Sequence, residues 1–300
     1  MNLTDTKDKK GQAKSYIKYL SALILFGLNG IVASRISNPS YEIVFMRTGI
    51  GTLLLAALFF CSGRKMTVQN NIKDLIYIAV SGVAMGMSWI FLYEAYTQAG
   101  VAVSSLLYYC GPVIVMILSP LLFREKLTAV KIMGFAVVLT GVVCVNGGAA
   151  SGKIKLYGFI CGIASAVMYS LMVIFNKKAK NTDGLENSVL QLAVSFVTSA
   201  VFMGTKNGFV IHIQSSELVW ILVLGLLNTG AGCYLYFSSI GGLSVQTVAV
   251  CGYLEPLSAV VFSALLLNEK MTAVQIAGAV MIIGGAVPGE NVFAKYKKHR

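Results

Sequence analysis

The chain has 300 residues, of which 56% are hydrophobic and only 12% are charged, and its mean hydropathy is +0.75. A soluble domain carries a charge on about a quarter of its residues, so this composition excludes an ordinary soluble protein and indicates a membrane protein. The net charge of +12 comes from short Lys and Arg clusters between apolar runs, not from one basic face. We therefore expect a lipid bilayer around the chain and no nucleic acid as a partner.

Ten apolar runs follow one another along the chain, and each approaches the roughly 20 residues that a helix needs to cross a membrane. They lie at 16–36, 40–62, 74–94, 100–122, 129–147, 156–176, 186–205, 216–238, 243–267 and 273–290. The connections between them are short, so no soluble domain is left over. The predicted fold is an all-α integral membrane protein in which ten transmembrane helices pack as one bundle.

The Lys and Arg residues are distributed unevenly between the two sets of connections. If the N-terminus is cytoplasmic, eighteen of the 24 fall on the cytoplasmic side, five fall outside, and Arg47 lies within a span. Cytoplasmic loops of membrane proteins carry an excess of Lys and Arg. We therefore expect a multi-pass protein of the cytoplasmic membrane with both termini in the cytoplasm.

Two connections of the chain are nearly the same. The segments "REKLTAVKIMG" at 124–134 and "NEKMTAVQIAG" at 268–278 are identical at seven of eleven positions. The same shift of 144 residues aligns further residues, namely Tyr109 with Tyr253, Pro112 with Pro256, Glu42 with Glu186 and Arg47 with Gln191. The chain is therefore predicted to contain an internal repeat.

The repeat has five spans, an odd number, so its second copy must enter the membrane from the opposite side. Inverted repeats of this kind recur in secondary transporters, because two similar halves in opposite orientation provide two similar states. The expected organisation is a cytoplasmic tail, two inverted five-helix repeats and a basic cytoplasmic tail, at 1–15, 16–147, 156–290 and 291–300.

Several motifs carry a resemblance to a known family. The first span contains "LFGLNGIVASR" at 25–35, and Pro39 in the second is followed eight residues on by Arg47. The fourth and ninth spans have a mid-helix proline and then a Glu-Lys-x-Thr loop. The chain resembles the drug/metabolite transporter superfamily, and within it the EamA family, over about 16–290, with Phe26 where the family has Trp. The resemblance implies ten helices, a central cavity between the halves and transport of small metabolites, often outward.

Glu255 stands in the middle of the ninth predicted span, within "VCGYLEPLSAVVFSALLLNEK" at 250–270. A carboxylate at this depth is paired, protonated or facing a water-filled cavity. Pro256 removes a backbone donor and frees the carbonyl near Gly252 for a substrate or water. We predict that Glu255 binds the proton or cation that couples transport. The alternative is a structural salt bridge to Arg47.

The repeat extends this interpretation to both halves. Gly111 stands where the second half has Glu255, so only one half carries the charge. Both halves keep the proline, and we predict that Pro112 and Pro256 act as hinges.

Two further charged residues are candidates for a site. The guanidinium of Arg47 suits a carboxylate or phosphate, but an arginine that ties helices together is an equally open interpretation. Glu94 is predicted near the outer surface, where it is either solvated at the interface or paired with Arg47. We group both residues as structural or anion-binding.

Aromatic and amide side chains at mid-span depth form the predicted substrate site, because aromatic faces attract cations and line ligand pockets. The predicted substrate-binding residues are Asn29, Trp89, Tyr109, Tyr169 and Tyr253. For Asn29, a structural hydrogen bond to another helix is the open alternative.

The sequence thus predicts a secondary transporter that moves a small polar metabolite, such as an amino acid, a related compound or a drug, by alternating access. Whether transport is proton-coupled and outward stays open. The alternatives are a membrane-embedded enzyme, for which no nucleophile–base pair is evident, and a channel without alternating access. No cofactor or metal is expected, because the six cysteines lack ligand spacing, and the protein is expected to be a monomer or homodimer.

Overall fold

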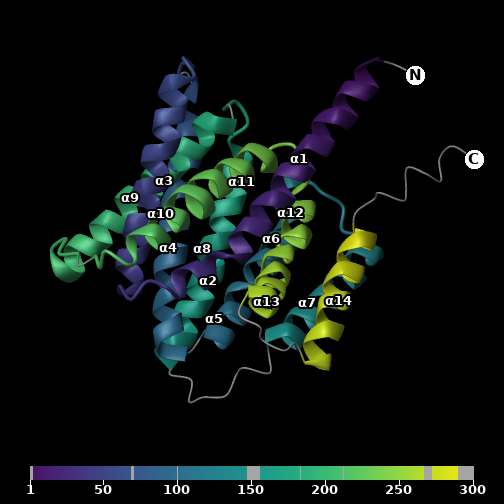
Figure 1. Ribbon diagram of the computed structural model, residues 1–300. Coiled ribbons are helices and arrows are strands. Elements are labelled where there is room, and N and C mark those ends of the chain that lie inside the picture. The colour runs from purple at the N-terminus through teal and green to yellow at the C-terminus, as the bar shows by residue number, and fades with distance from the viewer. Residues whose placement is uncertain are drawn as a thin grey trace, which may run out of the picture.

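Figure 1 shows the computed structural model, which describes residues 3–68, 71–99, 101–146, 156–182, 184–211, 213–266 and 272–289. Within these ranges every regular element is a helix, as predicted. The predicted basic tail 291–300, the last residue of the second repeat and the connection 147–155 lie outside the described residues.

The helices follow one another in two similar series. The first half contains α1 (Leu3–Gly27), α2 (Asn29–Ala33), α3 (Ser40–Cys61), α4 (Ile72–Ala99), α5 (Val101–Tyr108), α6 (Gly111–Phe123) and α7 (Ala129–Asn146). The second half contains α8 (Leu156–Lys178), α9 (Gly184–Asn207), α10 (Leu218–Leu222), the π-helical η3 (Val223–Ala231), α11 (Gly232–Ile240), α12 (Val245–Cys251), α13 (Leu254–Leu266) and α14 (Ala273–Gly289).

Eight segments of the described chain are long and apolar enough to cross a membrane, and two shorter apolar helices, Ala129–Cys144 and Ala273–Gly285, complete the series. They match the ten predicted spans in number and order. Most bounds agree within a few residues, and two differ more: α1 already begins at Leu3, and α4 continues to Ala99, past its predicted end at 94. An apolar window ends at the first charges, whereas the hydrogen bonds of a helix continue beyond them.

The fourth and ninth spans are each broken into two helices, α5/α6 and α12/α13. Pro112 and Pro256 lie in the first turn after the break, where a missing backbone N–H leaves no helical hydrogen bond unmade. The carbonyl of Gly252 was predicted to be free, and this detail is wrong. It accepts the N–H of Glu255 at 3.2 Å, three residues on, in a turn tighter than that of an α-helix.

Close helix contacts follow the internal repeat. α7 packs along its equivalent α14 (Figure 1). A β-carbon at Gly141 would lie 2.6 Å from the carbonyl oxygen of Gly278, and one at Gly285 would lie 2.5 Å from that of Gly134. Each of these residues is separated from its equivalent by 144 positions, so the two contacts are the same contact made twice. The halves are therefore packed around an approximate two-fold axis between α7 and α14.

One pair of equivalent contacts departs from this symmetry. α12 packs against α6, whereas the equivalent helices α5 and α13 are not a packed pair among the described residues. α5 instead packs against α4 and α8. By the repeat, α11 is the equivalent of α4 and α1 is the equivalent of α8, so α12 would contact α1 and α11 if the halves were symmetric. The backbone of α12 does not approach either helix closely among the described residues. The link to α1 is a hydrogen bond of 2.7 Å from the Tyr19 hydroxyl to the Val248 carbonyl. The broken helices α5/α6 and α12/α13 therefore pack against different neighbours in the two halves.

Candidate functional site

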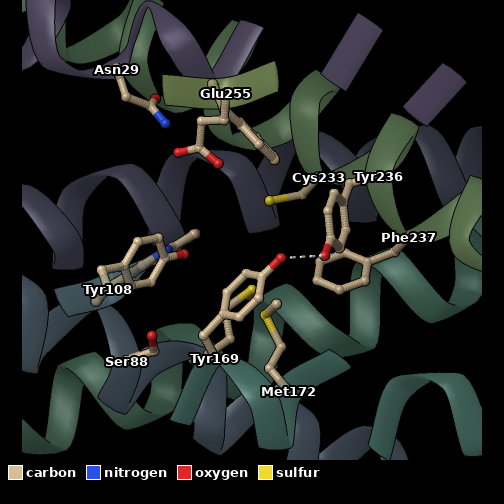
Figure 2. A pocket seen from close by; sticks show the side chains of 12 residues that line it. Asn29, Ser88, Tyr108, Tyr169, Met172, Cys233, Tyr236, Phe237 and Glu255 are labelled. Carbon is tan, nitrogen blue, oxygen red and sulfur yellow. Dashed lines mark hydrogen bonds between the residues drawn. The ribbon is translucent and has the colours of Figure 1, made fainter. Parts of the chain in front are cut away.

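A cavity lies at the centre of the bundle, with about 510 Å³ of space between the atoms around it, its open mouth included. Residues from both halves line it, as Figure 2 shows: Phe26, Asn29, Met85, Ser88, Trp89, Tyr108, Tyr169, Met172, Cys233, Tyr236, Phe237 and Glu255. Small-molecule sites in proteins are typically concave and largely apolar, with a few polar groups. This cavity is the candidate functional site.

Glu255 is the carboxylate of this cavity. It stands in the first turn of α13, and in Figure 2 its side chain points from that helix toward the rings of Tyr108 and Tyr169. Among the described residues, none donates a hydrogen bond to its carboxylate and none forms an ion pair with it. The predicted alternative of a salt bridge to Arg47 is therefore wrong. Its carboxylate lines the cavity and has no hydrogen-bond or ion-pair partner within the part of the chain that the structure describes.

Gly111, the equivalent of Glu255, has no room for a side chain. A β-carbon there would lie 2.6 Å from Cδ1 of Tyr169 and 3.1 Å from the carbonyl oxygen of Ala166. The Ser170 hydroxyl also donates to the Gly111 carbonyl at 3.0 Å. In the first half, neighbouring side chains therefore occupy the space beside Gly111. In the second half, the equivalent position presents the Glu255 carboxylate to the cavity.

Arg47 is engaged on every side by protein groups and is only 3% exposed. Its guanidinium lies 4.5 Å from the centre of the Trp89 ring. It donates from Nε to Thr229 (2.9 Å), and its two terminal nitrogens donate to the Tyr93 hydroxyl (3.4 Å) and to Oδ1 of Asn29 (3.3 Å). Arg47 joins α3, α4, η3 and the start of α2, and this geometry favours the tying role over anion binding.

The repeat supports this interpretation of Arg47. Its equivalent, Gln191, directs its amide nitrogen to the Met85 sulfur at 4.0 Å, and Met85 is the equivalent of Thr229. The same inter-helix contact is thus made in both halves with different side chains. Thr229 also donates to the carbonyl of Leu224 at 2.8 Å, five residues earlier, in keeping with the π-helical backbone of η3.

Asn29 connects the arginine to the cavity. Its Oδ1 accepts from Arg47, while its amide nitrogen points in the direction of the Glu255 carboxylate in Figure 2. Both roles that the sequence left open for Asn29 are therefore compatible with its position, because one end of the amide is structural and the other lines the cavity.

The predicted tyrosines divide into two groups. Tyr169 lines the cavity, where its hydroxyl lies 3.4 Å from that of Tyr236 in a hydrogen bond and its ring lies 5.3 Å from that of Tyr108. Tyr109 and Tyr253 are not among the residues that line the cavity. They contact each other at the two helix breaks, with ring centres 6.5 Å apart.

Glu94 lies away from the central cavity and does not pair with Arg47. Its carboxylate accepts from the amide of Gln98 at 3.3 Å, one turn on along α4. It lines a separate surface hollow with Tyr93 and Lys206. The predicted alternative of an Arg47–Glu94 pair is therefore wrong.

One end of the bundle is tied together by charged side chains. We call it the Lys177 end; there α6, α8 and α11 finish and α12 begins. The Lys177 ammonium donates to the carbonyls of the connection between α11 and α12, those of Ile240, Gly241 and Leu243. The Glu125 carboxylate accepts the first two N–H groups of α12, from Val245 (2.7 Å) and Gln246 (3.1 Å).

Gln246 provides two further contacts at the start of α12. Its side chain is buried and accepts from the Lys131 ammonium while it donates to the Ser119 hydroxyl on α6 at 3.0 Å. The N-terminus of α12 is thus held against α6 and the connection that follows it. Together with Lys177, these contacts hold the start of α12 in place at the Lys177 end, beside a hollow lined by Lys177, Phe237 and Gly241.

The comparisons with known proteins agree with this architecture. The sequence matches the model of the EamA-like transporter family over residues 13–147 and again over residues 156–287. The chain belongs to this family. Both repeats of the chain therefore correspond to one EamA unit each.

Relatives of this EamA-family chain align with it over about nine tenths of both sequences. It is 24% identical over 281 residues to the uncharacterized transporter YxxF of Bacillus subtilis (strain 168), covering 92% of this chain and 89% of that protein. It is also 24% identical over 288 residues to a probable amino-acid metabolite efflux pump of Escherichia coli (strain K12), covering 91% and 93%. A solved crystal structure with 17% identity superposes with a TM-score of 0.78, covering 93% of this chain and 97% of that one, and so shares the fold. The protein is a multi-pass membrane protein of a transporter family.

Sequence reasoning missed much of the cavity lining of this EamA-family protein. Most of the missed residues lie at helical spacing from a predicted residue or from one another. They form the stripes Met85–Ser88–Trp89 on α4, Tyr169–Met172 on α8 and Cys233–Tyr236–Phe237 on α11. Positions i, i+3 and i+4 share a helix face. The predicted Trp89 and Tyr169 could therefore have located Met85, Ser88 and Met172.

Within the described residues, no three or more His, Cys, Asp and Glu side chains gather so that they could hold a metal ion. The polar groups of the lining are one carboxylate, one amide, one indole N–H, one thiol and the hydroxyls of one serine and three tyrosines: Glu255, Asn29, Trp89, Cys233, Ser88, Tyr108, Tyr169 and Tyr236.

Proposed function

We propose that this chain is a secondary transporter that moves a small polar metabolite, such as an amino acid, a related compound or a drug, by alternating access. The observation that carries the proposal is the unequal packing of equivalent helices. α12 lies against α6, whereas α5 and α13 do not pack against each other. Because the halves are similar, a second arrangement is available in which each half adopts the helix contacts that the other half has now. Interconversion of the two arrangements opens the cavity to each side of the membrane in turn.

The charge distribution predicts a side for the Lys177 end. Lys177 and Arg124 belong to the clusters from which we expect both termini in the cytoplasm. The Lys177 end is then the cytoplasmic end. The proposal takes the contacts of Lys177 and Glu125 with α12 as the closure of this end, so that the arrangement described here is the outward-facing state. In the inward-facing state, α12 packs against α1 and α11, and α5 packs against α13. The moving units are the two repeats at 16–147 and 156–290.

Glu255 supplies the proposed coupling. It carries the cavity's carboxylate, which receives no hydrogen bond or ion pair from the described residues. A carboxylate in this position takes up a proton from one side of the membrane and releases it to the other as the cavity changes access. Inward movement of protons then drives outward movement of the substrate. Pro112 and Pro256 mark the helix breaks at which the change of access occurs.

The test uses purified protein and has two steps. A thermal-shift screen of metabolites at two pH values identifies a ligand, and the protein is then placed in liposomes loaded with that ligand. A carrier exchanges external labelled ligand against the internal pool and saturates. A channel, the alternative function, gives flux that is not accelerated by the internal pool and does not saturate, and that result would overturn the proposal.

A further inference from the structure

We infer that the central cavity binds a small organic amine in its cationic form, without a carboxylate, and that Glu255 is its counter-ion. This inference deepens the proposed transport function and rests on it, because it names the chemical class of the substrate. It is argued from the charge, the aromatic lining and the hydrogen-bond donors of the cavity.

The first argument is the charge of the cavity. Glu255 faces the cavity without a hydrogen bond or ion pair from the described residues. Arg47 lies close by, but it is buried, does not line the cavity and is engaged by Thr229, Tyr93 and Asn29. A charge that is desolvated in a protein needs a partner. A cationic ligand provides that partner for Glu255.

The second argument is the aromatic lining. Half of the residues around the cavity are aromatic, and they surround the carboxylate from several helices: Phe26, Trp89, Tyr108, Tyr169, Tyr236 and Phe237. Aromatic faces attract an ammonium group through the ring quadrupole, and more strongly when water is excluded. The same rings provide apolar area for the carbon skeleton of an amine, so one lining serves both parts of such a ligand.

The third argument is the lack of a match for a second, negative group. A ligand carboxylate needs cationic or strong N–H donors. Neither Lys nor Arg is among the lining residues. Of the lining hydroxyls, that of Ser88 donates to the Ser165 carbonyl at 2.9 Å, and those of Tyr169 and Tyr236 share one hydrogen bond. The donors left to the cavity, such as the Asn29 amide and the Tyr108 hydroxyl, are neutral. An amino acid would therefore bury its carboxylate without a cationic partner, whereas the corresponding amine would not.

The test compares matched pairs of compounds on the purified full-length chain. The probes are phenethylamine against phenylalanine, tyramine against tyrosine, and isoamylamine against leucine, and the members of each pair differ by the carboxylate. Binding is measured by isothermal titration calorimetry. We expect at least one amine to bind about tenfold or more tightly than its amino acid. Equal or tighter binding of the amino acid in every pair, or no binding of any amine at millimolar concentration, overturns the inference.

Two variants assign the binding to the carboxylate. Glu255→Gln keeps the shape and an acceptor oxygen but removes the charge, and we expect it to weaken amine binding about tenfold or more. Glu217→Gln is the matched control, because Glu217 lies outside the cavity and its Oε1 accepts the Ser37 N–H at 3.1 Å, which the amide oxygen of Gln can also do. Equal amine binding by Glu255→Gln and the unmutated protein contradicts the role of Glu255. If Glu255→Gln does not fold, the comparison of the pairs on the unmutated chain still decides the inference.

Liposome counterflow separates this inference from the proposed function. If amino acids are exchanged and amines are not, the protein is a carrier and the inference fails. If amines bind but no compound of either class is exchanged, the inference stands and the carrier function fails.

Discussion

The hydroxyl of Tyr253 donates a hydrogen bond to the carbonyl of Tyr109 at 2.8 Å, and these two residues are equivalents in the two repeats. The bond joins the breaks of the fourth and ninth spans at the centre of the bundle. It is made in one direction, from the second half to the first. In a state with exchanged roles, the Tyr109 hydroxyl would instead donate to the carbonyl of Tyr253.

This relationship predicts different effects for two matched variants. Tyr253→Phe removes the bond and leaves the Tyr109 carbonyl without this donor, so we expect it to destabilise the present state by about 1 kcal/mol. Tyr109→Phe removes an equivalent hydroxyl that makes no such bond here, and we expect little change. Melting temperatures of both variants in the same detergent provide the comparison. A larger loss for Tyr109→Phe would contradict the assignment of the state.

Arg47→Lys tests the tying role of the arginine. The variant keeps the charge but loses most of the donors to Thr229, Tyr93 and Asn29, and the planar group over Trp89. We expect a loss of about 2–3 kcal/mol of stability together with lower transport. Arg35→Lys is the control at an exposed site, with an expected change within about 0.5 kcal/mol. A stable Arg47→Lys protein that selectively loses anionic ligands would identify Arg47 as an anion-binding residue instead.

Lys177→Met tests the closure of the Lys177 end. The three carbonyls of residues 240–243 lose their ammonium donor, so the start of α12 should separate from its neighbours more often. We expect faster hydrogen–deuterium exchange of backbone amides over 240–252. Lys178→Met is the matched control on the same helix, since the Lys178 ammonium lies over the rings of Tyr77 and Phe175 and not over α12. Equal exchange in the two variants would show that Lys177 does not hold this end.

The orientation of the halves is a prediction from charge. Topology reporters fused at Arg300 and near Ser151 should label opposite sides of the membrane, with Arg300 on the cytoplasmic side. Two reporters on the same side would contradict the inverted arrangement of the repeats.

Part of this architecture could be predicted from the sequence. Spans, repeat and helix breaks leave local signals, namely apolar length, the 144-residue shift and the two prolines, and Glu255 stands out as a charge in an apolar run. The cavity lining could be predicted only in part. In a membrane, apolar residues face lipid as well as neighbouring helices, so the polarity of a helix does not say which face looks inward. Phe237 and Met172 therefore carry no distinguishing signal.

The partners of charged residues depend on packing and could not be predicted. The sequence leaves a salt bridge between Arg47 and Glu255 open as an alternative, because both are charged and both lie within spans. The structure instead places Asn29 and Trp89 beside the guanidinium, and leaves Glu255 to the cavity. Likewise, only the approach of Tyr169 explains why the equivalent position must be Gly111.

The central claim is that a carrier with alternating access is coupled to protons through Glu255, and one liposome experiment with Glu255→Gln tests it most directly. With the identified ligand raised to compensate for weaker binding, counterflow exchange should persist, because it needs only the change of access. Accumulation of the ligand against its gradient, driven by a pH difference, should disappear, because the titrating group is gone. Uphill flux in Glu255→Gln at the level of the unmutated protein would contradict the account.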